Sequence, residues 1–144
     1  MLDSGAARSV CPVSMCKEID VKPNPAGPAY FRTATGDRVQ NHGVRQIHGV
    51  ADDGTELSLM YNVAEVATAL DSVSQICDKG NVVVFTQQGG YICGPKCKLE
   101  FVRRNDTYVR TTWVKRPSRN TAGANPSSAM DIGSLTGFPR PVQP

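Results

Sequence analysis

The chain has 144 residues, 40% of them hydrophobic, and a formal net charge of +3. This length suits one domain with a modest core and a tail. The charge is too small to indicate a nucleic-acid-binding protein, and no apolar run approaches the length of a membrane span. The cysteines number five, which is odd, and no signal peptide is visible, so we expect a reduced, cytoplasmic protein.

The first half of the chain predicts strands separated by turn residues. Residues 22–28 hold three prolines, an asparagine and a glycine and therefore predict a loop. Residues 30–34 predict a strand. Residues 44–50 and 56–63 predict the arms of a hairpin with its tip at Asp52-Asp53-Gly54, because Asp-Gly favours tight turns between strands.

One helix is expected after this hairpin. Ser72 can cap it, the apolar residues Val73 and Ile76 lie three apart, and Gly80 can end it. The chain then predicts strands at residues 82–85, 91–93, 99–102 and 107–114, with turns at 88–90 and 105–106. The fold class is therefore mainly all-β with one short helix.

The composition changes at Pro117. Residues 117–144 contain five prolines, four serines and few large apolar side chains. Such a segment buries too little surface to offset the entropy of ordering it. We expect a domain over residues 1–116 and a flexible Pro/Ser/Gly-rich tail over 117–144, the alternative being a tail that drapes over the body.

The segment Asp3-Ser4-Gly5-Ala6 is the most informative motif. An aspartic peptidase needs such residues around its catalytic carboxylate: Asp3 would hold a water molecule, and Ser4 would tie the loop down. Gly5 would let the backbone turn beside the carboxylate because it lacks a Cβ, and Ala6 would pack under the turn. The alternative is an ordinary turn, since Asp, Ser and Gly all favour turns.

Several further stretches, in this order and spacing, resemble the retropepsin-like aspartic peptidase region of Copia-type retrotransposon polyproteins. The stretches are Leu2-Asp3-Ser4-Gly5-Ala6, Val10-Cys11-Pro12, Ala34-Thr35-Gly36, Val39, Asn41, Gly43, Gly49-Val50, the Leu-x-Ser-Val-Ser-Gln segment of residues 70–76, residues 79–85 and Gly89-Gly90-Tyr91-Ile92. The resemblance implies a small closed β-barrel of the retropepsin type that acts as a homodimer. It also implies an endopeptidase that processes a retroelement polyprotein and needs no cofactor or metal.

The chemistry requires two carboxylates and a water molecule. No second Asp-Thr-Gly or Asp-Ser-Gly occurs in the chain, which excludes a single-chain, two-lobed peptidase. The remaining route is a two-fold homodimer that contributes one Asp3 from each subunit. A hairpin would serve as the flap over the peptide: residues 39–50 are favoured for their glycines, and the hairpin around Asp52–Gly54 is the alternative.

Two features depart from the family. Only Met1 and Leu2 precede Asp3, where retropepsins usually carry an apolar strand that supports the dimer. Residues 66–71 contain no glycine, where family members often carry one before the closing helix. We therefore expect the isolated chain to be weakly active or inactive.

Other residues offer weaker candidate sites. Two cysteine pairs, Cys11/Cys16 and Cys93/Cys97, have spacings that a structural zinc site permits, with Cys77, His42 and His48 elsewhere, but ordinary thiols are favoured. Residues 96–119 carry eight basic side chains interleaved with Phe101, Tyr108 and Trp113. Such a pattern can bind single-stranded nucleic acid, yet a solvated strand face with its aromatic side chains in the core is favoured. His42 and His48 lack an activated Ser or Cys partner and are assigned to the surface or the flap.

Two classes of function therefore remain. The first is a dimeric aspartic endopeptidase that acts on polypeptides without a membrane or nucleic-acid partner. The second is a non-catalytic module, either a decayed retroelement domain or a small zinc- or peptide-binding β module.

Overall fold

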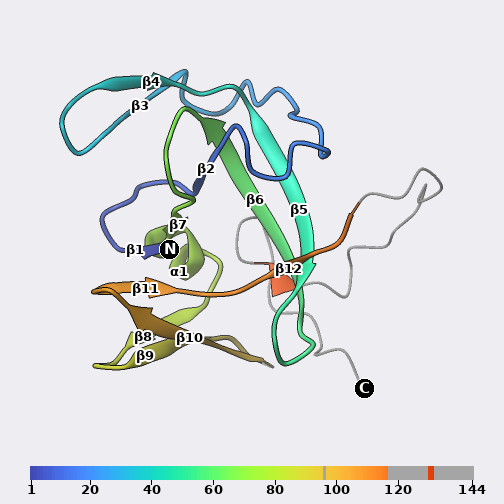
Figure 1. Ribbon diagram of the computed structural model, residues 1–144, viewed down its shortest axis with the longest axis vertical. Coiled ribbons are helices and arrows are strands. Elements are labelled where there is room, and N and C mark those ends of the chain that lie inside the picture. The colour runs from blue at the N-terminus through green and yellow to red at the C-terminus, as the bar shows by residue number, and fades with distance from the viewer. Residues whose placement is uncertain (96, 117–129, 132–144) are drawn as a thin grey trace.

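A computed structural model of the chain describes residues 1–95, 97–116 and 130–131. These residues form two curled half-barrel sheets, a separate two-stranded hairpin and one short helix (Figure 1). The expected mainly β fold with one short helix is thereby confirmed. No helix of the described part is long and apolar enough to cross a membrane.

The six-stranded sheet carries the start of the chain. Its order is β7 (Asp71–Ser72), β1 (Leu2–Asp3), β11 (Thr107–Val109), β10 (Lys98–Arg104), β9 (Gly89–Cys93) and β8 (Val82–Phe85). β1 runs parallel to β7 and antiparallel to β11, so the strand that ends at Asp3 has a neighbour on each side. The strands from β8 to β11 form an antiparallel meander joined by short turns.

The five-stranded sheet is built around the predicted long hairpin. β5 (Val44–Val50) and β6 (Glu56–Ala64) pair along their whole length, and β12 (Trp113–Val114) extends the sheet beside β5. β2 (Val10–Pro12) and β13 (Met130–Asp131) both run parallel to β6. The hairpin expected at residues 44–63 is confirmed.

A third, two-stranded sheet stands apart from the other two. Among the described strands, β3 (Tyr30–Arg32) and β4 (Arg38–Gln40) pair only with each other. The guanidinium carbon of Arg38 lies 4.7 Å from the centre of the Tyr30 ring. In Figure 1 this hairpin projects from the top of the molecule towards the side where the loop after β1 lies.

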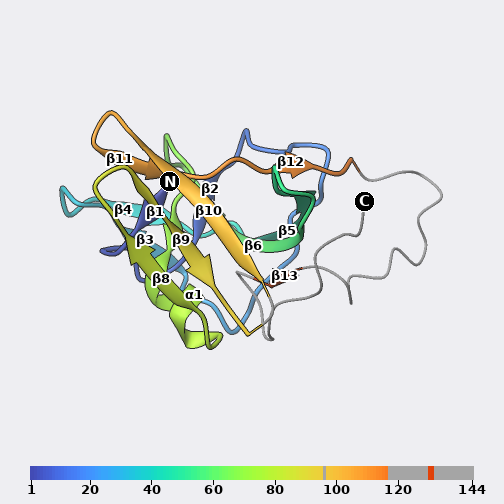
Figure 2. The ribbon, with the colours of Figure 1, turned by 90° about the horizontal axis from the view of Figure 1, so that it is seen from below.

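The helix α1 (Val73–Asp78) begins and ends where the sequence predicts. Ser72 is its N-cap and accepts a hydrogen bond from the Gln75 N–H, and Gly80 follows the helix with a φ of +84°. Ile76 is fully buried and anchors the helix to the core. The helix lies next to β7 and β8, which are the two end strands of the six-stranded sheet, and Figure 2 shows it beside β8.

The core lies between the two large sheets. Buried and half-buried residues alternate along β5, as expected for a strand with one face in the core, whereas β6 is buried almost throughout, so side chains on both of its faces are covered. Ile47, Leu57, Val63, Ile76 and Ile92 are fully buried. Each such side chain stabilises the fold by roughly 1.5–3 kcal/mol relative to exposure.

Two expectations about the strands differ from the structure. The strand orders are open, so the described strands form two curled sheets rather than one closed barrel, and α1 lies between the strands that a closed sheet would join. The single strand expected at residues 107–114 is divided into β11 and β12, which belong to different sheets. The chain leaves one sheet for the other at Arg110, whose side chain turns into the interior to meet Asp71.

The division into a domain over residues 1–116 and a tail over 117–144 stays a prediction. Within the predicted tail, Met130–Asp131 form β13 beside β6. The remainder of residues 117–144 lies outside the described residues.

Candidate active site

Asp3 lies at the end of β1 and is half-buried. Its Oδ1 accepts a hydrogen bond of 2.8 Å from the Gly5 N–H, and its carbonyl oxygen lies 3.4 Å from the Ala6 nitrogen. A Cβ on Gly5 would sit only 3.3 Å from the same Oδ1. Gly5 thus allows the backbone to approach one oxygen of the carboxylate closely.

The loop after Asp3 is tied down by Ser72, the N-cap of α1. The Ser72 hydroxyl donates a hydrogen bond of 2.7 Å to the Ala6 carbonyl oxygen, and Ser72 is fully buried. Ser4, which the sequence predicts for this task, is exposed, and its hydroxyl has no partner among residues that the structure describes. The hydroxyl that fixes the loop therefore comes from a residue 66 positions later than Ala6.

Ser9 connects the far end of the same loop to the helix. Its hydroxyl accepts a hydrogen bond of 2.9 Å from the Ser72 N–H, and its own N–H donates one of 2.8 Å to the Gln75 side chain. The Ser9 carbonyl accepts bonds from the backbone and side-chain nitrogens of Asn62. Sequence reasoning missed Ser9 and Asn62, although the Ser-Val-Ser-Gln segment that it singled out contains Ser72 and Gln75, which bind Ser9.

An open hollow of about 320 Å³ adjoins Asp3. Its walls include Asp3 and Asp106 as acidic groups and Phe85 and Tyr108 as aromatic ones. The ring centres of Phe85 and Tyr108 are 4.8 Å apart, and the Tyr108 hydroxyl donates a 2.9 Å bond to the Thr86 carbonyl. Asp106 is 3.0 Å from Arg103 at the exposed rim. The aromatic walls are therefore held in fixed positions beside the carboxylate.

A buried ion pair lies behind the Asp3 strand. Arg110 Nε is 2.9 Å from Asp71 Oδ2, and Arg110 Nη2 donates bonds of 2.9 Å to Asp71 Oδ1 and 2.8 Å to the Tyr61 hydroxyl. Burial alone would lower the pKa of Arg110, but the Asp71 carboxylate and the Tyr61 hydroxyl raise it above its ordinary value. Burial also raises the pKa of Tyr61. The arginine is thus charged and the tyrosine neutral.

The structure changes the choice of hairpin for a flap. Residues 39–50, which the sequence favours, do not form one hairpin, because Val39 belongs to β4 and residues 44–50 form β5. β5 and β6 contribute Ile47 and Leu57 to the core and are part of a large sheet. The β3–β4 hairpin is free of both large sheets.

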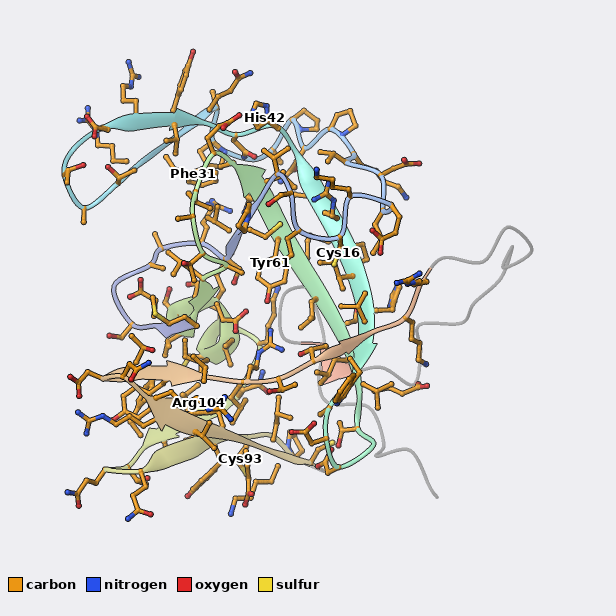
Figure 3. The ribbon with its side chains drawn as sticks, in the orientation of Figure 1. Cys16, Phe31, His42, Tyr61, Cys93 and Arg104 are labelled. Carbon is orange, nitrogen blue, oxygen red and sulfur yellow. The ribbon has the colours of Figure 1, made fainter. Side chains whose placement is uncertain are left out.

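The cysteines form no disulfide, and the described part of the chain holds no cluster of three or more potential metal ligands from His, Cys, Asp and Glu. Cys16 and Cys93, one from each predicted pair, lie in different parts of the molecule (Figure 3). Burial raises the pKa of the Cys11 thiol to about 11. Cys11 is fully buried, as expected for a thiol that packs in a core.

The remaining candidate residues lie away from Asp3. Phe101 is buried, as expected for an aromatic side chain of the basic stretch, but Trp113 is 65% exposed and donates a hydrogen bond to Asp52, which corrects the prediction for that residue. Its strand β12 lies at an edge of the five-stranded sheet, among the strands that the structure describes. His42 lies 3.8 Å from Glu65, and His48 is half-buried on β5.

Comparisons with protein-family models, with curated proteins and with solved structures found no match to this chain. The described residues define a mainly β protein with a half-buried carboxylate at the end of an internal strand.

Proposed function

We propose that the protein is an aspartic endopeptidase that acts as a homodimer and, on its resemblance to the retropepsins, processes a retroelement polyprotein. The observation that carries the proposal is the setting of Asp3: the Gly5 N–H binds one carboxylate oxygen, and Ser72 and Ser9 fix the loop that contains both residues. A catalytic carboxylate needs this kind of preorganisation because its orientation must be set before substrate binds.

The second carboxylate would come from Asp3 of a second copy related by a two-fold axis. Two carboxyl groups held close together cannot both ionise easily and share one proton. The ionised group would draw a proton from the water, the water would attack the scissile carbonyl, and the protonated group would stabilise the oxygen that develops charge.

The β3–β4 hairpin is the proposed flap. It pairs with no other strand among the described residues and projects to the side of the molecule that carries the Asp3 loop (Figure 1). Gly36 at its turn has a φ of +89°, a conformation that glycine adopts without strain. The hairpin would close on an extended substrate through backbone hydrogen bonds, as an added strand does.

The test is cleavage of an unfolded polypeptide and of internally quenched peptides near pH 5, at protein concentrations that favour dimers. We expect Asp3→Asn to lower the rate at least about 100-fold, the range of a lost general acid–base group. Asp20→Asn is the matched control, because Asp20 is an exposed carboxylate on the long loop before β3.

Two results would contradict the proposal. One is cleavage that survives Asp3→Asn. The other is a wild-type chain that stays monomeric in sedimentation with a statine peptide added and cleaves nothing. The second result would leave a non-catalytic β module as the remaining reading of this fold.

A further inference from the structure

The strand that ends at Asp3 is enclosed by segments from two distant parts of the chain. Leu2 pairs with Asp71 of β7 on one side and with Tyr108 of β11 on the other. The Asp71 N–H also donates a hydrogen bond of 2.7 Å to the Met1 carbonyl. β1 itself has only two residues, so its place depends on what keeps β7 and β11 together.

Asp71 and Arg110 supply a direct connection between these two strands. Asp71 begins β7, and Arg110 follows the last residue of β11. Arg110 Nη2 donates a hydrogen bond of 2.9 Å to Asp71 Oδ1, and Arg110 Nε lies 2.9 Å from Asp71 Oδ2 without a hydrogen bond, so one directional bond and one ionic contact join the two groups. The connection therefore passes from one neighbour of β1 to the other.

Tyr61 adds a third attachment, from the other sheet. Its hydroxyl donates to Asp71 Oδ1 and accepts from Arg110 Nη2 at 2.8 Å. Figure 3 shows its side chain directed from β6 into the interior between the two sheets. A further bond joins Arg110 Nη1 to the Thr112 hydroxyl. The cluster thus ties the six-stranded sheet to the five-stranded one at the level of β1.

The burial of this cluster argues for a role in position rather than in stability. The side chains of Arg110 and Asp71 are only 4% and 7% exposed. Desolvation offsets most of the attraction in such a pair, and well-packed apolar residues often serve stability equally well. A hydrogen-bonded ion pair differs from an apolar contact because its hydrogen bonds are directional and restrict how the two side chains can lie against each other.

We propose that Asp71, Arg110 and Tyr61 form a positioning cluster that fixes the β1 strand, and with it the Asp3 carboxylate, in the geometry that catalysis requires. The inference rests on the proposed function for what is positioned. The positioning itself is a physical property that can be measured whether or not the chain cleaves peptides.

The Gly5 amide proton provides the readout. It is bonded to Asp3 Oδ1, so its chemical shift follows the ionisation of Asp3 in a pH titration of the ¹⁵N-labelled full chain. The key variant replaces both charges with apolar side chains, Asp71→Leu with Arg110→Met, and leaves no unpaired buried charge. Lys115→Met is the control, because it removes an ion pair, Lys115 with Glu56, that is partly exposed and lies on the other sheet.

We expect the double variant to stay folded but to unfold at a lower denaturant concentration than the wild type, because the buried Tyr61 hydroxyl loses both of its hydrogen-bond partners. We also expect the Gly5 amide to lose at least half of its chemical-shift change in the pH titration. The Asp71 N–H, which binds the Met1 carbonyl, and the Val10 N–H, which binds the Leu70 carbonyl, should exchange with solvent at least ten times faster than in the wild type, when their rates are compared with those of the amides in β5 and β6. In the control, all these values stay at those of the wild type.

The outcomes separate the two proposals. A folded double variant with an unchanged Gly5 titration and unchanged exchange overturns the positioning role, and so does a double variant that fails to fold, since the cluster would then serve folding itself. If the wild-type chain cleaves peptides, the double variant should have a kcat at least tenfold lower than that of the wild type and a KM within about twofold of it. A wild-type chain that stays monomeric and cleaves nothing contradicts the proposed function, while the Gly5 titration still decides on the cluster.

Discussion

The loop that follows Asp3 is held by side chains that lie far from it in the sequence. Among the described residues, Gly5 alone donates a hydrogen bond to the Asp3 carboxylate, whereas Ser72 and Gln75 bind the loop from the start of α1. The same hydroxyl of Ser72 caps the helix and binds the loop. One small residue thus links the formation of the helix to the position of the candidate catalytic group.

Ser72→Ala tests this link. The variant loses the cap of the Gln75 N–H and leaves the Ala6 carbonyl without its donor, so we expect the free energy of unfolding to fall by about 1–3 kcal/mol. Urea unfolding measures the change. Ser14→Ala is the control, because Ser14 is exposed, and its effect should stay within about 0.5 kcal/mol. Equal values for the two variants would contradict the account of the loop.

At the scale of elements, the β10–β11 hairpin shows how a turn sets the register of a strand next to β1. Arg104 pairs with Thr107, which leaves Asn105 and Asp106 as a two-residue loop with φ values of +49° and +64°. Positive φ at both positions is the type I′ arrangement that suits the twist of antiparallel strands. The register of β11, and hence the pairing of Tyr108 with Leu2, follows from this turn.

Asp106→Gly should stabilise this hairpin. Asn-Gly is the preferred type I′ pair, and the ion pair lost with Arg103 is exposed at Asp106 and contributes little. We expect a gain of up to about 1 kcal/mol, measured as a higher midpoint of thermal unfolding. The Asp106→Ala variant keeps a Cβ at the same positive φ, so it should be less stable than the wild type and than the Asp106→Gly variant. A glycine variant no more stable than the alanine variant would show that the turn is not under this constraint.

At the scale of the whole molecule, the buried Cys11 thiol and Tyr61 phenol should make the protein less stable at alkaline pH. Burial raises the pKa of Cys11 from its ordinary 9.0 to about 11, and burial also raises the pKa values of Cys16, Cys97 and Tyr61. The unfolded chain loses these protons at lower pH than the folded chain does. Raising the pH therefore favours the unfolded state.

Below about pH 9, we expect the ionisation of Cys11 to leave the free energy of unfolding unchanged. As the pH rises towards 11, it should lower that free energy. The slope from one group reaches about 1.4 kcal/mol per pH unit, which gives about 2–3 kcal/mol over this interval. Urea unfolding between pH 8 and 11 measures the loss. Cys11→Val, a substitution of similar size, should remove this loss of stability between pH 9 and 11. An unchanged loss in the variant would contradict the assignment to Cys11.

The elements that could be predicted from sequence are those that local patterns specify. Asp53-Gly54 with flanking apolar residues predicted the β5–β6 hairpin, and Ser72 with Gly80 predicted the bounds of α1. Two other patterns misled: residues 107–114 suggested one strand, and Trp113 suggested a core side chain. Arg110, where the chain leaves one sheet for the other, binds Asp71, which is 39 residues away.

The sequence by itself determined the class of fold, the one helix and the candidate carboxylate, because alternation, caps and turn residues act over a few positions. Only the tertiary structure decided that the strands form two open sheets, that Ser72 rather than Ser4 fixes the Asp3 loop, and that Asp71, Arg110 and Tyr61 meet behind β1. These arrangements join residues that lie 39 or 66 positions apart in the chain. No local pattern encodes such pairs, since they form only when packing brings β1, β7 and β11 side by side.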